Sequence, residues 1–146
     1  MAFGNPYAAY QTTAVKTASQ GKLVVMLYQG VEREMTAALK CFDADEKLPT
    51  SKIEDFGKHV MKAQEIISEL QVSLDMDKGG QIAQNLMSLY VYFNKELLNV
   101  SISHDKEKLK IILGMIKQLC SAWEVAASTT QADSIPQAQR ALNITG

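Results

Sequence analysis

The 146-residue sequence lacks the features that mark membrane, secreted or nucleic-acid-binding proteins. Its most apolar run, Leu23–Leu27, is far too short for a bilayer span, which takes about 20 residues. Met1–Gln20 has neither the basic start nor the apolar stretch of a signal peptide. The 15 basic residues balance 16 acidic ones, and no segment gathers enough positive charge to neutralise a run of phosphates. We therefore expect a cytoplasmic protein that binds no nucleic acid and inserts into no membrane.

Cysteine is scarce. The only two, Cys41 and Cys120, lie far apart in the sequence and within apolar helical patterns. Free cysteine is among the most buried residue types, so we expect two buried thiols rather than a disulfide. Such thiols indicate a reducing compartment.

Motifs for catalysis and metal binding are also missing. The stretch "DMDKGG" at Asp75–Gly80 begins like a calcium loop, but Leu86 stands where the loop requires a bidentate glutamate. Neither His59 nor His104 has a glutamate three residues before it, as a di-iron helical bundle would need. No phosphate-binding loop is present. We expect no enzymatic activity, no metal and no cofactor.

Helical periodicity is what the sequence does have. Apolar residues recur at spacings of three and four in four segments, which are Ser19–Phe42, Ile53–Leu74, Ile82–Val100 and Leu109–Ala126. Short polar stretches separate these segments. The pattern predicts an all-α fold, an antiparallel up-and-down four-helix bundle, and no β-sheet.

The ends of the predicted helices carry recognisable signals. Ser19 is placed to cap the first helix, and Ser51–Glu54 reads as a capping box for the second. Asp75 or Asp77 could cap the third. The bundle is predicted to span residues 19–128. An extended segment or short helix, residues 1–18, should cap it, and a polar tail, residues 129–146, should be poorly ordered with at most one short helical turn.

The third and fourth segments hold more apolar residues than one core-facing stripe requires. The surplus residues, with two from the first segment, are Met26, Tyr28, Met87, Tyr90, Val91, Tyr92, Leu98, Ile111, Leu113 and Met115. Some of them could simply widen the core. As a set they predict a contiguous apolar surface that receives the apolar face of a partner's helix. A scaffold that only dimerises through the third segment is the alternative.

Four separated stretches together resemble one known family. They are "NPYAAYQ" (residues 5–11), "VKTASQGKLVVMLYQG" (15–30), "LDMDKGGQIAQNLMSLYVYF" (74–93) and "AWEVA" (122–126). In this order and spacing they are similar to the flagellin-specific export chaperones, the FliS family, over residues 5–127. Two positions depart from the family pattern, because Gln20 replaces the usual proline and Gln29 the usual acid.

The resemblance implies a small helical chaperone in the cytoplasm. It would bind the C-terminal segment of flagellin, prevent premature polymerisation and deliver flagellin to the flagellar type III export gate without an ATP cycle. The free protein would be a monomer or a weak homodimer. In this family the N-terminal piece lies across the bundle near the client groove. The expected groove or lid residues are Tyr7, Tyr10, Met26, Met87, Tyr90, Val91, Asn94, Leu98, Ile111 and Met115.

One alternative function comes from a different class. The stretch "KHVMKA" around His59 resembles the H-x-L-K-G signature of histidine phosphotransfer bundles. His59 adjoins the predicted core positions Phe56 and Val60, so one ring edge could be exposed and nucleophilic. A structural histidine at the bundle surface explains the same residues.

Overall fold

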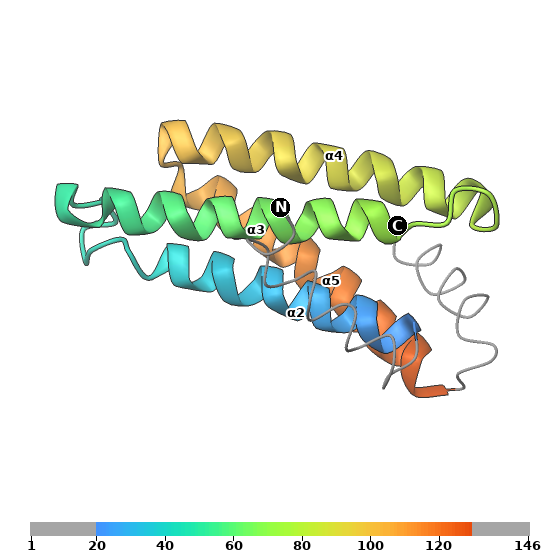
Figure 1. Cartoon of the computed structure of the whole chain (residues 1–146). Coiled ribbons are helices and arrows are strands. Elements are labelled where there is room, and N and C mark those ends of the chain that lie inside the picture. Colours follow the sequence, from blue (N-terminus) through green and yellow to red (C-terminus); the bar gives the residue numbers. More distant parts are fainter. Residues whose placement is uncertain (1–19, 130–146) are drawn as a thin grey trace, which may run out of the picture.

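The computed structural model describes residues 20–129, which fold into four long α-helices (Figure 1). The elements are α2 (Gln20–Leu39), the short 3-10 helix η2 (Thr50–Lys52), α3 (Ile53–Ser73), α4 (Gly80–Ser103) and α5 (Lys106–Thr129). Successive helices run antiparallel, and residues 20–129 contain no strand. The predicted all-α four-helix bundle is confirmed. Ser19, the N-terminal segment 1–18 and the tail beyond Thr129 lie outside the described residues.

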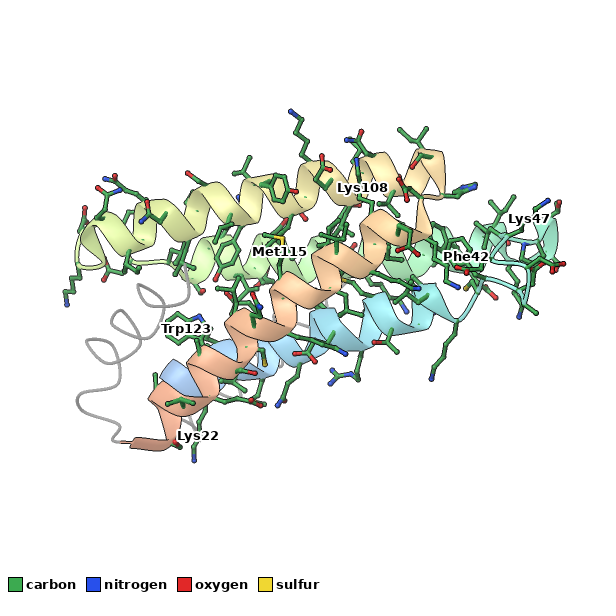
Figure 2. All side chains as sticks on the ribbon, turned by 180° about the vertical axis from the view of Figure 1, so that it is seen from behind. Lys22, Phe42, Lys47, Lys108, Met115 and Trp123 are labelled. Atoms are coloured by element: carbon green, nitrogen blue, oxygen red, sulfur yellow. The ribbon has the colours of Figure 1, made fainter. Side chains whose placement is uncertain are left out.

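The four helices do not pack equally on one another. α2 packs along both α3 and α5, and α4 lies mainly against α3. α5 crosses the bundle obliquely, so α4 and α5 meet at their connecting loop and diverge toward their other ends (Figures 1 and 2). The side of the bundle between α4 and α5 is therefore its least closely packed side.

The core is continuous through all four helices. Of the stripe predicted for α3, Phe56, Val60, Ala63, Ile67 and Leu70 are fully buried. Ile53, the first residue of that stripe, is 41% exposed because it lies at the start of α3, beyond the end of the core. The predicted core of this helix is therefore correct except at its ends.

Two tyrosines lie inside this core and form a hydrogen bond there. The Tyr28 and Tyr90 hydroxyl oxygens are 2.6 Å apart, and the two side chains are 0% and 1% exposed. Burial raises the pKa of both phenols well above the usual range. The Trp123 Nε1 atom is also buried and lies beside the Tyr28 hydroxyl, without a hydrogen bond of ordinary geometry within residues 20–129. The tyrosine pair joins α2 to α4 across the centre of the molecule.

The predicted helix caps differ from those observed. Ser51 lies within η2 rather than in the extended conformation of a cap, and α3 begins at Ile53 without a side-chain cap. The capping-box prediction was wrong, because the bond from the Lys52 N–H to the Pro49 carbonyl closes a 3-10 turn first.

Two aspartates shape the other connections. Asp75 Oδ1 accepts hydrogen bonds from the backbone N–H groups of Asp77 and Lys78, so it stabilises the turn before α4 instead of capping the helix. At the next connection His104 takes the left-handed conformation that ends α4, and Asp105 Oδ1 accepts from the Lys108 N–H in the first turn of α5.

Both cysteines are buried and unpaired, as the sequence predicted. Burial raises the pKa of the Cys120 thiol to about 12, with Glu32 acting in the same direction. Among residues 20–129, no helix is long and apolar enough to cross a bilayer.

Candidate partner-binding surface

Two half-buried stripes face each other where α4 and α5 diverge. Ile82, Leu89 and Glu96 follow one another at seven-residue intervals on α4, and Lys108, Met115 and Ala122 do the same on α5. Residues seven apart share one face of a helix, because seven residues complete nearly two turns. The Glu96 and Lys108 side chains are in contact across the two helices, so the apolar members of both stripes lie on the facing sides.

We call this region the α4–α5 surface. It consists of Ile82, Leu89, Ile111, Met115, Ala122 and Trp123. Five of these pack partly against the core, and Ile111 is 63% exposed. Figure 2 shows Met115 and Trp123 on the side of α5 that faces α4. A helix lying between α4 and α5 would meet an apolar floor with little charge.

An ion pair closes one end of the α4–α5 surface. Lys108 Nζ lies 2.9 Å from Glu96 Oε1. The hydrogen bond from Lys108 lowers the pKa of the Glu96 carboxyl, and the same bond raises the pKa of Lys108. The pair lies near the loop where α4 and α5 meet, so the surface is open only toward the start of α4 and the end of α5.

The structure divides the predicted groove residues among several places. Met87 and Asn94 lie on the α3 side of α4, where the Gln71 side-chain amide contacts the Met87 sulfur at 3.4 Å and Asn94 Nδ2 donates to Ser68 Oγ at 3.3 Å. Asn94 Oδ1 is buried and has no hydrogen-bond partner within residues 20–129. These two residues hold α4 against α3 and do not line the α4–α5 surface.

The other α4 candidates are either buried in the core or exposed on the outer face. Tyr90 is part of the buried tyrosine pair. Val91 and Leu98 are 51% and 53% exposed, seven residues apart on the outer face. On α5, Ile111 and Met115 do belong to the α4–α5 surface.

The remaining candidates lie elsewhere. Met26 on α2 is half-buried and borders a different pocket, described next. Tyr7 and Tyr10 lie outside the described residues. Leu89, Ala122 and Trp123 were not among the groove residues predicted from the sequence. The sequence did contain a signal for these residues. Leu89 lies seven residues before Glu96, and Ala122 lies fourteen after Lys108, so an ion pair between the two charges would bring both stripes face to face.

An apolar pocket of about 320 Å³ lies between the start of α2 and the end of α5. Its walls are Val25 and Met26 of α2 and Ala127 and Ser128 of α5, with Lys22 and Glu124 bordering it. Figure 2 shows Lys22 beside the last turns of α5. We call this the end pocket.

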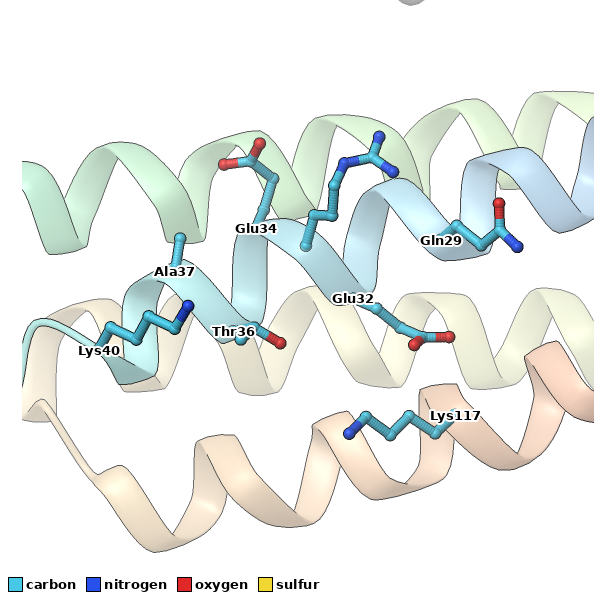
Figure 3. Close-up of a pocket in the computed structure, with 8 residues that line it drawn as sticks. Gln29, Glu32, Glu34, Thr36, Ala37, Lys40 and Lys117 are labelled. Atoms are coloured by element: carbon cyan, nitrogen blue, oxygen red, sulfur yellow. The ribbon is translucent and has the colours of Figure 1, made fainter.

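A second hollow, of about 710 Å³, runs along α2 and is polar (Figure 3). Its lining combines Glu32, Arg33, Glu34 and Lys40 of α2 with Lys117 of α5. Charges of both signs alternate around it, so it favours neither an anion nor a cation. No cluster of three potential metal-binding side chains occurs within residues 20–129.

His59 makes a contact between helices. Its Nδ1 atom lies 2.8 Å from Glu34 Oε1, and its side chain is 32% exposed. The carboxylate holds one ring nitrogen and would repel a phosphoryl group at that atom. This geometry is that of a structural link between α2 and α3.

A comparison with known protein families identifies the family of this chain. The family model described as "Flagellar protein FliS" matches residues 3–130, most of the chain. The chain belongs to the FliS family. The match spans all four helices, both stripes of the α4–α5 surface and the end pocket, and it stops one residue after α5.

Individual relatives agree with the family assignment. The flagellar secretion chaperone FliS of Bacillus subtilis is 29% identical over 133 residues, covering 91% of this chain and 94% of the relative. Those of Escherichia coli and Salmonella typhimurium are 31% and 29% identical over 113 residues, covering 77% of this chain and 79% of each relative. The FliS resemblance predicted from the four sequence stretches is therefore confirmed.

Proposed function

We propose that this FliS-family protein is a flagellar secretion chaperone that binds the C-terminal segment of flagellin on its α4–α5 surface. The observation that supports the site most is the pair of facing apolar stripes, open at one end and closed by the Glu96–Lys108 ion pair at the other. The relatives named flagellar secretion chaperones support the class of function. In this proposal, covering the client's apolar helix faces prevents flagellin from polymerising in the cytoplasm.

The physical chemistry of the surface suits a helical client. A client helix that lays its apolar face between α4 and α5 would bury Met115, Ala122 and Trp123 completely, and apolar burial is worth about 25 cal/mol per Å². Ordering a previously unfolded segment subtracts about 2–5 kcal/mol or more from the contact energy. The subtraction keeps an extensive interface reversible, which a carrier that must release its client requires.

The N-terminal segment has a part in this proposal. Tyr7 and Tyr10 would dock as a lid on apolar residues of α2, α4 and α5 and rearrange when flagellin binds. The outward residues Val91 and Leu98 lie on the other side of α4, so in this proposal they do not contact the same client helix.

The other parts of the function are also proposals. The protein acts without catalysis, metal or cofactor, and it delivers its client to the flagellar type III export gate. It works in the cytoplasm as a monomer or weak homodimer. His59 serves as a link to Glu34, so we expect His59→Gln to leave client binding unchanged.

A matched pair of substitutions tests the site. Ile111→Asp places a charge on the α4–α5 surface, and Ile102→Asp makes the same change on α4, where the side chain is 74% exposed. Ile111 has about two thirds of its surface left to bury, so its loss should weaken binding by roughly 1–2 kcal/mol, or about 5- to 30-fold. Binding of purified flagellin monomer, measured by calorimetry, should show this loss for Ile111→Asp and no change for Ile102→Asp.

The opposite ranking would place the client elsewhere. If Ile102→Asp weakened binding and Ile111→Asp did not, the outer face of α4 would be the site. Both variants change exposed side chains, so circular dichroism should show an unchanged fold in each.

A further inference from the structure

The outer side of α3 and α4 carries five of the ten large apolar side chains that are exposed within residues 20–129. The two helices lie side by side along their length (Figure 1). Each has an outward stripe whose members follow one another at intervals of four, three and four residues, a spacing that keeps them on one side of a helix. We call the two stripes together the α3–α4 face. Its eight exposed residues are Met61, Glu65, Ser68 and Val72 on α3, and Val91, Lys95, Leu98 and Ile102 on α4.

Hydrogen bonds between the helices fix the register of the two stripes. Gln64 Nε2 donates to the Asn94 carbonyl at 3.1 Å, and Asn94 Nδ2 donates to Ser68 Oγ at 3.3 Å. The helices are antiparallel, so each step forward along α3 corresponds to a step back along α4. Glu65 is therefore level with Lys95, to within about 3 Å at 1.5 Å per residue.

The same register aligns the apolar members of the face. It places Met61 level with Leu98, and Ile102 level with Gly57. An added methyl at Gly57 would meet no atom within 4 Å, so the α3 surface is open at this level. The large exposed side chain on α4 thus lies beside an open position on α3.

The two charged members of the α3–α4 face are opposite in sign. Neither Glu65 nor Lys95 forms a salt bridge within residues 20–129. Rotating a second copy by 180° about an axis parallel to the helices places its α4 stripe over the α3 stripe of the first copy at the same level. Glu65 of each copy then faces Lys95 of the other, and the symmetry forms this pair twice.

We propose that the α3–α4 face binds a second copy of this chain, in a two-fold symmetric dimer with α3 of each copy packed against α4 of the other. Across this interface Met61 packs on Leu98, and Ile102 lies over Gly57. The face is about 30 Å long, the length of α3, and about 20 Å wide, the width of two helices. The dimer therefore buries at most about 1,200 Å² in total, which is the low end for specific interfaces and indicates a weak dimer.

Sedimentation velocity of the full-length protein tests the proposal. About 50 mM salt is suitable, because low salt preserves attraction between exposed charges. The parent should shift from monomer toward dimer as its concentration rises. Glu65→Lys and Lys95→Glu each turn two attractive pairs into two repulsive ones, so each should weaken the dimer at least about tenfold. The matched change Glu107→Lys, at a side chain 73% exposed on α5, should leave the dimer unchanged.

An equimolar mixture of Glu65→Lys and Lys95→Glu gives the sharpest result. One chain then carries lysine at both positions and the other carries glutamate at both, so a mixed dimer regains two attractive pairs. The mixture should dimerise about as well as the parent, although each variant alone does not. A mixture that stays monomeric would overturn the proposal, and so would single variants that dimerise like the parent.

Other occupants of the α3–α4 face would give different results. If the parent stays monomeric and Glu65→Lys weakens flagellin binding, the face holds part of the client and the proposal is wrong. The dimer and the α4–α5 surface use opposite sides of α4, so Ile102→Asp should weaken the dimer and leave flagellin binding unchanged. A protein that dimerises but binds no flagellin would refute the proposed function alone.

Discussion

The buried tyrosine pair gives a prediction whose size follows from the structure. Tyr28→Phe removes one hydroxyl and leaves the Tyr90 hydroxyl inside the core without its 2.6 Å partner. An unsatisfied buried hydroxyl costs about 1–3 kcal/mol, and Tyr90→Phe should also be unfavourable because it leaves the Tyr28 hydroxyl without this partner. The double variant removes both hydroxyls, keeps the ring contact at 6.3 Å between centroids, and should be nearly neutral.

Equilibrium urea unfolding followed by circular dichroism measures these differences. With a slope of about 1–3 kcal/mol per molar urea, a 2 kcal/mol loss lowers the midpoint by about 1 M. The exposed Tyr92, at 42%, supplies the control Tyr92→Phe, which should not move the midpoint. Single variants whose losses simply add in the double variant would refute the reasoning, because they would show that the two hydroxyls do not depend on each other.

Two further predictions concern stability. The pKa of Glu96 is lowered in the folded state, so its contribution to the free energy of unfolding is present above the unfolded pKa near 4.3 and is lost as pH falls through the lower folded value. Urea midpoints measured between pH 6 and pH 3 should therefore fall less steeply for Glu96→Gln than for the parent. Parallel curves would contradict this. Gly114 lies in the exposed interior of α5, where an added methyl meets no atom within 4 Å, so Gly114→Ala should stabilise the fold by about 0.5–1 kcal/mol. Gly79→Ala would place a methyl 2.7 Å from the Asp75 carbonyl oxygen and should destabilise the fold. Thermal melts that rank the two variants the other way would contradict this reasoning.

Periodicity predicted the helices because burial, rather than any single interaction, determines them. The three–four spacing of Phe56, Val60 and Ala63 requires one buried face, and the structure buries it. Helix ends were less predictable, since the competition between a serine cap and a 3-10 turn at Ser51 involves small energy differences that depend on Pro49.

The binding surface was only partly predictable for a related reason. A surplus of apolar residues on α4 was visible in the sequence, but the side on which each lies depends on which neighbour α4 packs against. Because α4 packs mainly on α3, Met87 and Asn94 are used in that contact. Tyr90 lies on the core-facing side of α4, where its hydroxyl bonds to that of Tyr28. Leu89, which follows the three–four spacing of its segment, is only half-buried because α5 crosses obliquely and leaves that side of α4 partly open.

The most direct test of the central claim uses flagellin itself. Purified full-length protein is mixed with flagellin monomer that retains or lacks its last roughly 40–60 residues, the length that a client of several helices needs at about 1.5 Å per residue. Sedimentation should show a complex with intact flagellin and none with the truncated form. A complex that forms equally well with both, or with neither, would contradict the account.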